Sequence, residues 1–207
     1  MTSHERMQAL IQAIDYLEKH KIEGDIVECG VWKGGSMLIA AKRLLNNNSK
    51  ERNLYLFDTF EGMSNPTDLD ISSIDNEKAS DLLGKVEKTS GDNIWCYSTE
   101  QEVAKTMTSS GYPVSKIHLI KGKVEDTIPH KSLNRIALLR LDTDWYESTK
   151  HELENLFDLL VPGGILIIDD YGHWSGARKA VDEFIEKRKL KLFLNRIDYT
   201  GRIAIKN

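Results

Sequence analysis

Apolar positions follow two different spacings along the chain, and these spacings predict alternating helices and strands. Residues Met7, Leu10, Ile14 and Leu17 recur every three or four positions, which predicts a helix over residues 5–20. The same spacing predicts further helices over residues 35–46, 99–110, 147–160 and 175–188. Short continuous apolar runs, which are typical of buried parallel strands, lie at residues 25–30, 54–58, 117–120, 136–141 and 165–168.

The order of these elements predicts the fold class. Regular strand–helix alternation indicates a parallel sheet with helices on both faces. Two final apolar segments, 190–197 and 202–205, flank a turn that ends in Gly201, which indicates a closing hairpin. We therefore predict one α/β domain over residues 1–207, with a mostly parallel seven-stranded sheet and an antiparallel strand at one edge.

Residues 61–95 interrupt this alternation. They carry turn-forming residues such as Gly62, Asn65 and Pro66, followed by a short amphipathic pattern near residues 76–88. Long loops in compact domains are usually either functional or disordered. We interpret this segment as a lid or acceptor-binding insertion, with disorder as the alternative.

Composition narrows the function classes. The 207 residues are 40% hydrophobic and 29% charged, as in ordinary soluble proteins. A net charge of −4, with lysines spread along the chain, favours neither a nucleic-acid partner nor a membrane surface. The polar start of the chain shows no signal peptide, and no apolar run has the length of a membrane span. Cys29 and Cys96 form no metal-binding motif, so we expect a cytoplasmic enzyme with reduced thiols, and homo-oligomer formation stays open.

Paired carboxylates follow two of the predicted strands. Asp142 and Asp144 come after the run 136–141, and Asp169 and Asp170 come directly after another apolar run. In open α/β sheets, ligands bind beyond the carboxyl ends of the strands, so these four side chains should share one rim. Four crowded carboxylates repel one another, and a hard divalent ion such as Mg²⁺ would hold them through oxygen ligands. The alternative is that they are solvated turn residues.

The loop after the first predicted strand, residues 28–36, is rich in glycine. Its G-x-x-x-G-G pattern starts at Gly30 and has Trp32 where a dinucleotide site needs its second glycine, which argues against NAD or FAD. The following helix start, near Ser36, suits a smaller anion such as an amino-acid carboxylate, although a tight turn alone would also explain the glycines. Asp58 ends the second strand, where α/β nucleotide sites place an acid on ribose hydroxyls.

Four motifs occur in order at residues 28–36, 57–62, 141–144 and 169–172. Together they closely resemble the macrocin O-methyltransferase family, whose members are class I S-adenosylmethionine (SAM) enzymes that methylate sugar hydroxyls of macrolide and aminocoumarin antibiotics and related glycans. The resemblance covers about residues 7–188 and implies a Rossmann-like class I methyltransferase fold. Family members are commonly longer at the N-terminus and after the second strand, so we expect a more open acceptor pocket here.

The resemblance also implies roles for single residues. It implies a SAM site in which the methionine part contacts Glu28, Gly30 and Ser36. The ribose would contact Asp58, and the adenine would contact Val124 and Glu125. It implies that Mg²⁺ is bound by Asp142, Asp169 and Asp170, and that the catalytic base is Asp144. Such an ion can orient two vicinal sugar hydroxyls and lower the pKa of the reacting one, whose proton a nearby carboxylate can take.

Two other functions are consistent with parts of the sequence. The D-x-D motif Asp142-Thr143-Asp144 would suit a metal-dependent glycosyltransferase, but that reading leaves the second pair of aspartates unexplained. A non-catalytic Rossmann-like binding protein is the third hypothesis. The neighbouring residues Tyr146, His173 and Trp174 would line an acceptor pocket or simply pack, and Arg178 and Lys179 are expected on a solvated face.

Overall fold

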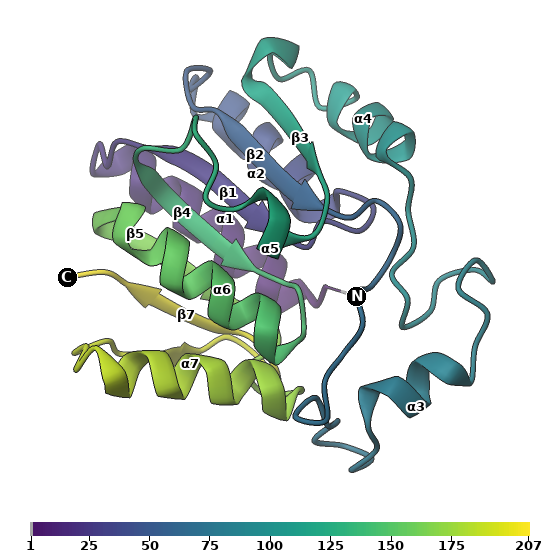
Figure 1. Ribbon diagram of the computed structural model, residues 1–207. Coiled ribbons are helices and arrows are strands. Elements are labelled where there is room, and N and C mark those ends of the chain that lie inside the picture. The colour runs from purple at the N-terminus through teal and green to yellow at the C-terminus, as the bar shows by residue number, and fades with distance from the viewer. Residues whose placement is uncertain (1) are drawn as a thin grey trace.

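A mostly parallel sheet runs through the computed structural model, which describes residues 2–207 (Figure 1). Its strands are β1 (Asp25–Cys29), β2 (Leu54–Asp58), β3 (Ile117–Lys121), β4 (Ile136–Leu141), β5 (Leu160–Ile168), β6 (Asn195–Arg196) and β7 (Arg202–Ile205). Within the described residues they form one seven-stranded sheet in the order β3-β2-β1-β4-β5-β7-β6. Strand β7 runs antiparallel to β5 and to β6. The predicted fold is therefore confirmed, including the closing hairpin.

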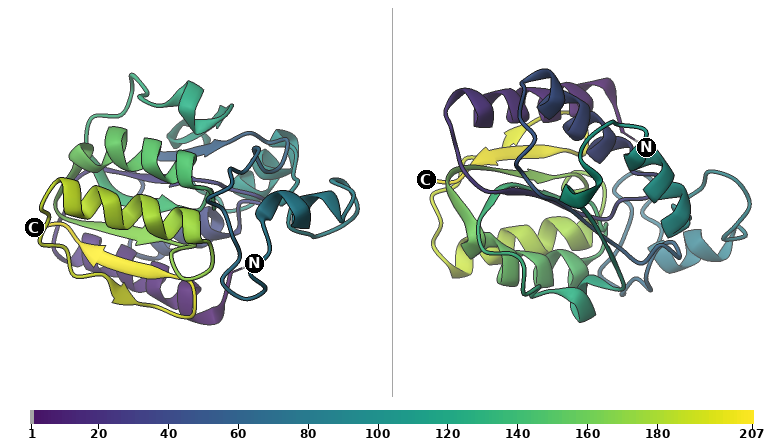
Figure 2. Two further views of the ribbon diagram at one scale, coloured as in Figure 1. Left: turned by 60° about the horizontal axis from the view of Figure 1, so that its bottom comes forward. Right: turned by 90° about the horizontal axis from the view of Figure 1, so that it is seen from above.

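Helices cover both faces of this sheet (Figure 2). One face packs against α1 (His4–Lys19), α2 (Gly35–Asn46) and α4 (Glu100–Thr108). The other packs against α5 (Val124–Thr127), α6 (Tyr146–Leu156) and α7 (Ser175–Lys187). Two short 3-10 helices, η1 (Val114–Lys116) and η2 (Phe157–Leu159), precede β3 and β5. Alternate residues of each central strand enter opposite cores, which explains why these strands read as continuous apolar runs.

The strand order reverses between β1 and β4. From β1 the chain adds β2 and β3 on one side of the sheet, and β4 then pairs with the other side of β1. Gly30 follows β1 with φ +81°, and a Cβ there would lie 2.0 Å from the carbonyl oxygen of Asp142. Glycine is therefore required for the ends of these two strands to approach, and the crevice beyond them is where ligands of such sheets bind.

The insertion after β2, residues 61–95, packs against the rest of the domain. It contains α3 (Ala79–Gly84), which is shorter than the helix expected at residues 76–88, and it extends beyond the carboxyl ends of the strands (Figure 2). Leu83 from α3 packs in a small core with Trp145 and Trp174. Ser72 forms a β-bridge with Trp174. The segment thus has defined packing, and its role as a lid or acceptor-binding element stays a prediction.

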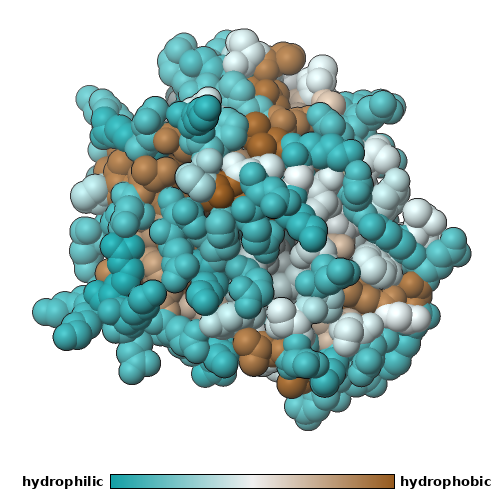
Figure 3. Space-filling view, in the orientation of Figure 1, coloured by the Kyte–Doolittle hydropathy of each residue, from teal (hydrophilic) through white to brown (hydrophobic). Residues whose placement is uncertain are grey.

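The surface agrees with the expected solvated face of α7. Arg178 and Lys179 are exposed and lie 3.6 and 3.9 Å from Asp182 and Glu183, one turn further along the helix. The face that includes α6 and α7 is mainly hydrophilic (Figure 3). Among the residues that the structure describes, no helix combines the length and the apolar composition needed to cross a bilayer.

Candidate active site

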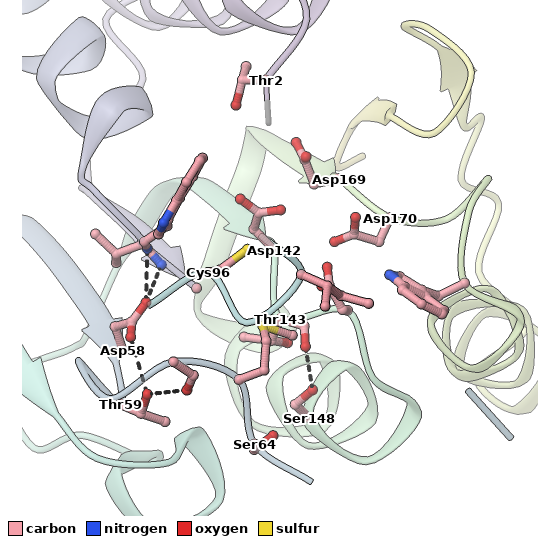
Figure 4. Close-up of a pocket in the computed structure, with 18 of the residues that line it drawn as sticks. Thr2, Asp58, Thr59, Ser64, Cys96, Asp142, Thr143, Ser148, Asp169 and Asp170 are labelled. Carbon is pink, nitrogen blue, oxygen red and sulfur yellow. Dashed lines mark hydrogen bonds between the residues drawn. The ribbon is translucent and has the colours of Figure 1, made fainter. Parts of the chain in front are cut away.

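A cavity of about 700 Å³ lies at the carboxyl ends of the central strands (Figure 4). The residues predicted to form the site nearly all line this one cavity, namely Gly30, Ser36, Asp58, Val124, Glu125, Asp142, Asp144, Asp169 and Asp170. They lie at the carboxyl ends of β1 to β5 or at the starts of the loops and helices that follow, so the fold collects side chains that are far apart in the sequence. Glu28 differs from them, because it is 1% exposed and lies within the wall.

The start of α2 contributes backbone amides to the cavity. The residue before this helix, Gly34, has φ +78° and makes no side-chain capping hydrogen bond. The amides of the first turn, including those of Gly35 and Ser36, therefore have no partner within the helix, and both residues line the cavity. Unpartnered amides and the helix dipole suit an anion, so this wall fits the methionine carboxylate of SAM.

Asp58 joins the loops that follow β1 and β2. Its Oδ2 accepts hydrogen bonds from the N–H groups of Val31 at 2.6 Å and Trp32 at 3.0 Å, and its Oδ1 accepts one from Phe60 at 2.7 Å. Burial raises the pKa of Asp58 above its usual range, although these donors act in the opposite direction. Ribose hydroxyls would have to share the carboxylate with these amides, and the ribose role of Asp58 stays a prediction.

Arg140 is one of two arginines of the site, with Arg6, that the sequence analysis did not predict. This β4 side chain is 4% exposed, and its guanidinium lies 2.6 Å from a carboxylate oxygen of each of Glu28, Asp142 and Asp169. An arginine inside a buried apolar strand must be paired, so the run Leu139-Arg140-Leu141 did contain the signal. The position of Glu28 in the wall agrees with this contact, because its Oε1 accepts a hydrogen bond from Arg140.

Arginines therefore balance part of the negative charge that the sequence analysis assigned to a metal ion. Arg6 of α1 forms an ion pair with Asp169 and another, at 3.0 Å, with Asp198. Burial acts to raise the pKa of Asp169, but Arg140 and Arg6 lower it below its usual range. For Glu28, burial outweighs the attraction of Arg140, whose charge is shared, and raises the pKa to about 7.

Asp142, which also pairs with Arg140, forms a group with Asp144 and Asp170. One carboxylate oxygen from each lies within 4.8 Å of the others. Oδ2 of Asp170 is buried and has no hydrogen-bond partner among the described residues. Burial raises the pKa of Asp144 to about 7, and burial together with the charge of Asp144 raises the pKa of Asp170 well above its usual range. Crowded, half-buried carboxylates with an unused oxygen fit a hard divalent cation.

The predicted division of roles stays a prediction. The resemblance placed Asp169 among the metal ligands and Asp144 outside them. In the structure Asp144 lies beside Asp142 and Asp170, Asp142 and Asp169 both pair with Arg140, and Asp169 also pairs with Arg6. Of the neighbouring aromatic residues, His173 and Trp174 line the cavity. Tyr146 does not line it and instead donates its hydroxyl to Glu183 of α7 at 2.7 Å.

A sequence model of the family described as macrocin-O-methyltransferase (TylF) matches residues 1–205. The chain belongs to the macrocin O-methyltransferase family. It is therefore an O-methyltransferase, as the sequence predicts, and the glycosyltransferase and non-catalytic hypotheses are not supported.

Named relatives agree with this membership of the macrocin O-methyltransferase family. The chain is 31% identical over 201 residues to 8-demethyl-8-(2,3-dimethoxy-alpha-L-rhamnosyl)-tetracenomycin-C 4'-O-methyltransferase of Streptomyces olivaceus, which covers 97% of this chain and 73% of that protein. It is 28% identical, with the same coverage, to demethyldecarbamoylnovobiocin O-methyltransferase of Streptomyces niveus. It is 26% identical to mycinamicin III 3''-O-methyltransferase of Micromonospora griseorubida, over 97% of this chain and 76% of that one.

Solved structures support the same fold. The O-methyltransferase NovP superposes with a TM-score of 0.84 at 26% identity, over 98% of this chain and 80% of that one. The calicheamicin methyltransferase CalS11 has a TM-score of 0.73 at 19% identity, over 98% and 80% of the two chains, and this shows the fold alone. A methyltransferase of Podospora anserina, PaMTH1, was solved with bound S-adenosylhomocysteine and has a TM-score of 0.62 at 13% identity, over 100% and 80% of the two chains.

Proposed function

We propose that this protein transfers a methyl group from SAM to a sugar hydroxyl of a glycosylated small molecule, and that a divalent ion such as Mg²⁺ assists. The grouping of Asp142, Asp144 and Asp170 within one cavity carries the proposal, because it joins a cation site to the helix-end amides that fit SAM. The names of the relatives support a sugar acceptor, since they include a rhamnosyl tetracenomycin and a 3''-position of mycinamicin III.

The cavity divides into a cofactor part and an acceptor part. On the cofactor part, the first amides of α2 would bind the methionine carboxylate, and Val124, which is 5% exposed, would offer an apolar surface to the adenine. SAM supplies an electrophilic methyl group, and the transfer is an in-line displacement whose main demand on the protein is positioning. Rigid loops at strand ends meet that demand, because Asp58 and Gly30 fix the loops after β1 and β2.

The acceptor part lies at the ends of β4 and β5. We assign Asp142 and Asp170 to the divalent ion and Asp144 to the proton of the reacting hydroxyl. Bound at these carboxylates, Mg²⁺ would lower the pKa of a sugar hydroxyl. We assign Asp169 to holding Arg140, because its two oxygens contact Arg140 and Arg6. Arg140 in turn fixes Asp142 at 2.6 Å.

The proposal is tested with purified protein, SAM and a panel of natural-product glycosides that carry free vicinal hydroxyls. We expect mass spectrometry to show addition of one methyl group, loss of product in excess chelator and its return with Mg²⁺. Full turnover in excess chelator would contradict the role of the metal ion but not the methyl transfer. Binding of SAM in calorimetry without methylation of any glycoside would contradict the sugar acceptor.

Matched variants separate the base from the ligands. Asp144→Asn keeps size and polarity but takes up no proton, so turnover should fall by about 10²–10⁴ and saturating Mg²⁺ should not restore it. Asp170→Asn should raise the Mg²⁺ concentration needed for half-maximal rate, and excess Mg²⁺ should restore much of that rate. Asp169→Asn should raise this Mg²⁺ concentration less than Asp170→Asn does. If excess Mg²⁺ restores the turnover of Asp144→Asn, Asp144 is a metal ligand and not the base.

A further inference from the structure

Glu152 is a buried carboxyl group that the proposed chemistry does not use. It lies on α6, is 0% exposed, and does not line the cavity. Its Oε1 accepts a hydrogen bond from Oγ1 of Thr143 at 2.9 Å. Its Oε2 is buried and has no hydrogen-bond partner within the part of the chain that the structure describes. Burial raises the pKa of Glu152 well above its usual range. An orphaned buried oxygen destabilises the folded state, so its presence calls for an explanation.

The partner of Glu152 lies inside a strained turn. Thr143 stands between two rim carboxylates, and the next residue, Asp144, has φ +68°. The N–H of Trp145 donates to the carbonyl of Thr143 at 2.8 Å across Asp144. A three-residue turn with positive φ at its centre is rare and strained for a residue other than glycine. Such strain persists only where surrounding contacts over-determine it, and it gathers at functional sites.

Contacts on both sides hold this turn in place. Trp145, which is 1% exposed, donates its ring N–H to the carbonyl of Ser64 at 3.0 Å. The hydroxyl of Ser148 lies 3.1 Å from the carbonyl of Trp145 and 3.4 Å from that of Thr143, and Figure 4 shows the second contact as a dashed line. The bond from the Thr143 hydroxyl to Glu152 is the contact that fixes the side chain of this residue. It therefore connects the body of α6 to the backbone that carries Asp144.

We propose that Glu152 is a positioning residue for methyl transfer, which through Thr143 holds the strained turn that aims Asp144 at the acceptor hydroxyl. The proposal rests on the role of Asp144 proposed above. Glu152 itself touches no substrate, because it lies behind the cavity wall. A displacement of about 1 Å at a reacting group is enough to lower turnover by about a hundredfold, so one buried hydrogen bond can matter to the rate.

Four variants test this positioning role. Glu152→Leu and Thr143→Val remove the hydrogen bond and keep the volume, whereas Glu152→Gln and Thr143→Ser keep an acceptor and a hydroxyl. We expect the first pair to lower kcat by about tenfold to a hundredfold. The second pair should stay within about threefold of wild type. The double variant Thr143→Val/Glu152→Leu should be no slower than either single variant, because both remove the same contact.

Stability separates positioning from a merely structural role. Glu152→Leu replaces an orphaned buried carboxyl with an apolar group, so its Tm should equal or exceed that of wild type while kcat falls. The proposal would be overturned if both the Tm and the kcat of Glu152→Leu fall, or if its kcat stays within about twofold of wild type. Equal losses of kcat in Glu152→Leu and Glu152→Gln would also overturn it.

A crystal structure of Glu152→Leu adds a readout that does not depend on activity. A relaxed turn, with Asp144 at negative φ, supports the positioning role, and an unchanged turn overturns it. If wild-type protein methylates no sugar, the proposed function fails, and this structure still decides whether Glu152 holds the turn.

Discussion

Replacing Arg140 with methionine should be one of the most destabilising single changes in this protein. Arg140→Met keeps much of the side-chain volume but removes the cation from Glu28, Asp142 and Asp169, each 2.6 Å away. Arg140, Glu28 and Asp169 are 4%, 1% and 2% exposed, so solvent does not replace the lost partner. Breaking a buried ion pair from one side costs about 3–5 kcal/mol. That is a large part of the roughly 5–15 kcal/mol that holds a typical domain folded.

The size of this loss should depend on pH. Without Arg140 the carboxylates bind protons more readily in the folded state than in the unfolded state, so stability falls as pH rises. The loss should therefore be larger at about pH 8 than at about pH 6, because the pKa of Glu28 is already about 7 with Arg140 present. Urea denaturation followed by tryptophan fluorescence at the two pH values measures both effects.

Two control variants define the expected result. Arg178→Met removes an exposed arginine that is paired at 3.6 Å with Asp182, and it should change stability by less than about 0.5 kcal/mol. Arg140→Lys keeps the charge but loses the planar guanidinium that reaches several carboxylates. Its loss of stability should therefore lie between those of Arg178→Met and Arg140→Met. A loss below about 1 kcal/mol in Arg140→Met, or an equal loss at both pH values, would refute this account of the buried charges.

Three further predictions follow from single contacts. Asp58→Ala should weaken SAM binding by about 1–3 kcal/mol in calorimetry, and unchanged affinity would contradict the cofactor assignment. Asp70→Ala should cost about 2–4 kcal/mol in denaturation, because buried Asp70 accepts hydrogen bonds from the N–H groups of Tyr146 at 2.8 Å and Thr67 at 2.6 Å. Glu28→Gln should gain stability relative to wild type as pH rises from about 5 to 8, because the raised pKa of Glu28 favours folding of the wild type at low pH. A difference in unfolding free energy between the two proteins that stays constant over this pH range would contradict the raised pKa.

The sheet and the rim carboxylates could be predicted because both depend on local pattern. Buried parallel strands leave continuous apolar runs, and a carboxylate directly after such a run must lie at the carboxyl edge of the sheet. Asp142 and Asp170 accordingly line one cavity, as the sequence predicts. The segment 190–197 was harder, because an edge strand has few buried contacts, and its regular part shrinks to Asn195–Arg196.

The distribution of partners among the carboxylates could not be predicted. Which aspartate contacts an arginine depends on side-chain directions in three dimensions, and Arg6 lies 163 residues before Asp169 in the chain. The left-handed conformation of Asp144 leaves no mark on its own residue type, since aspartate is common in both turns and strand ends. The hydrogen bond from Thr143 to Glu152 could not be predicted either, because a glutamate on a helix is ordinarily solvated.

The contacts of Ser3 and Arg6 couple the start of α1 to the hairpin of β6 and β7. The hydroxyl of Ser3 donates to Asp198 at 2.7 Å across 195 residues of sequence, and Arg6 joins Asp198 to Asp169. Local opening of one element is cooperative with the elements that it contacts. Fraying of this helix end would therefore withdraw a cation from the aspartate rim, so the charge balance of the site should respond to the local stability of α1.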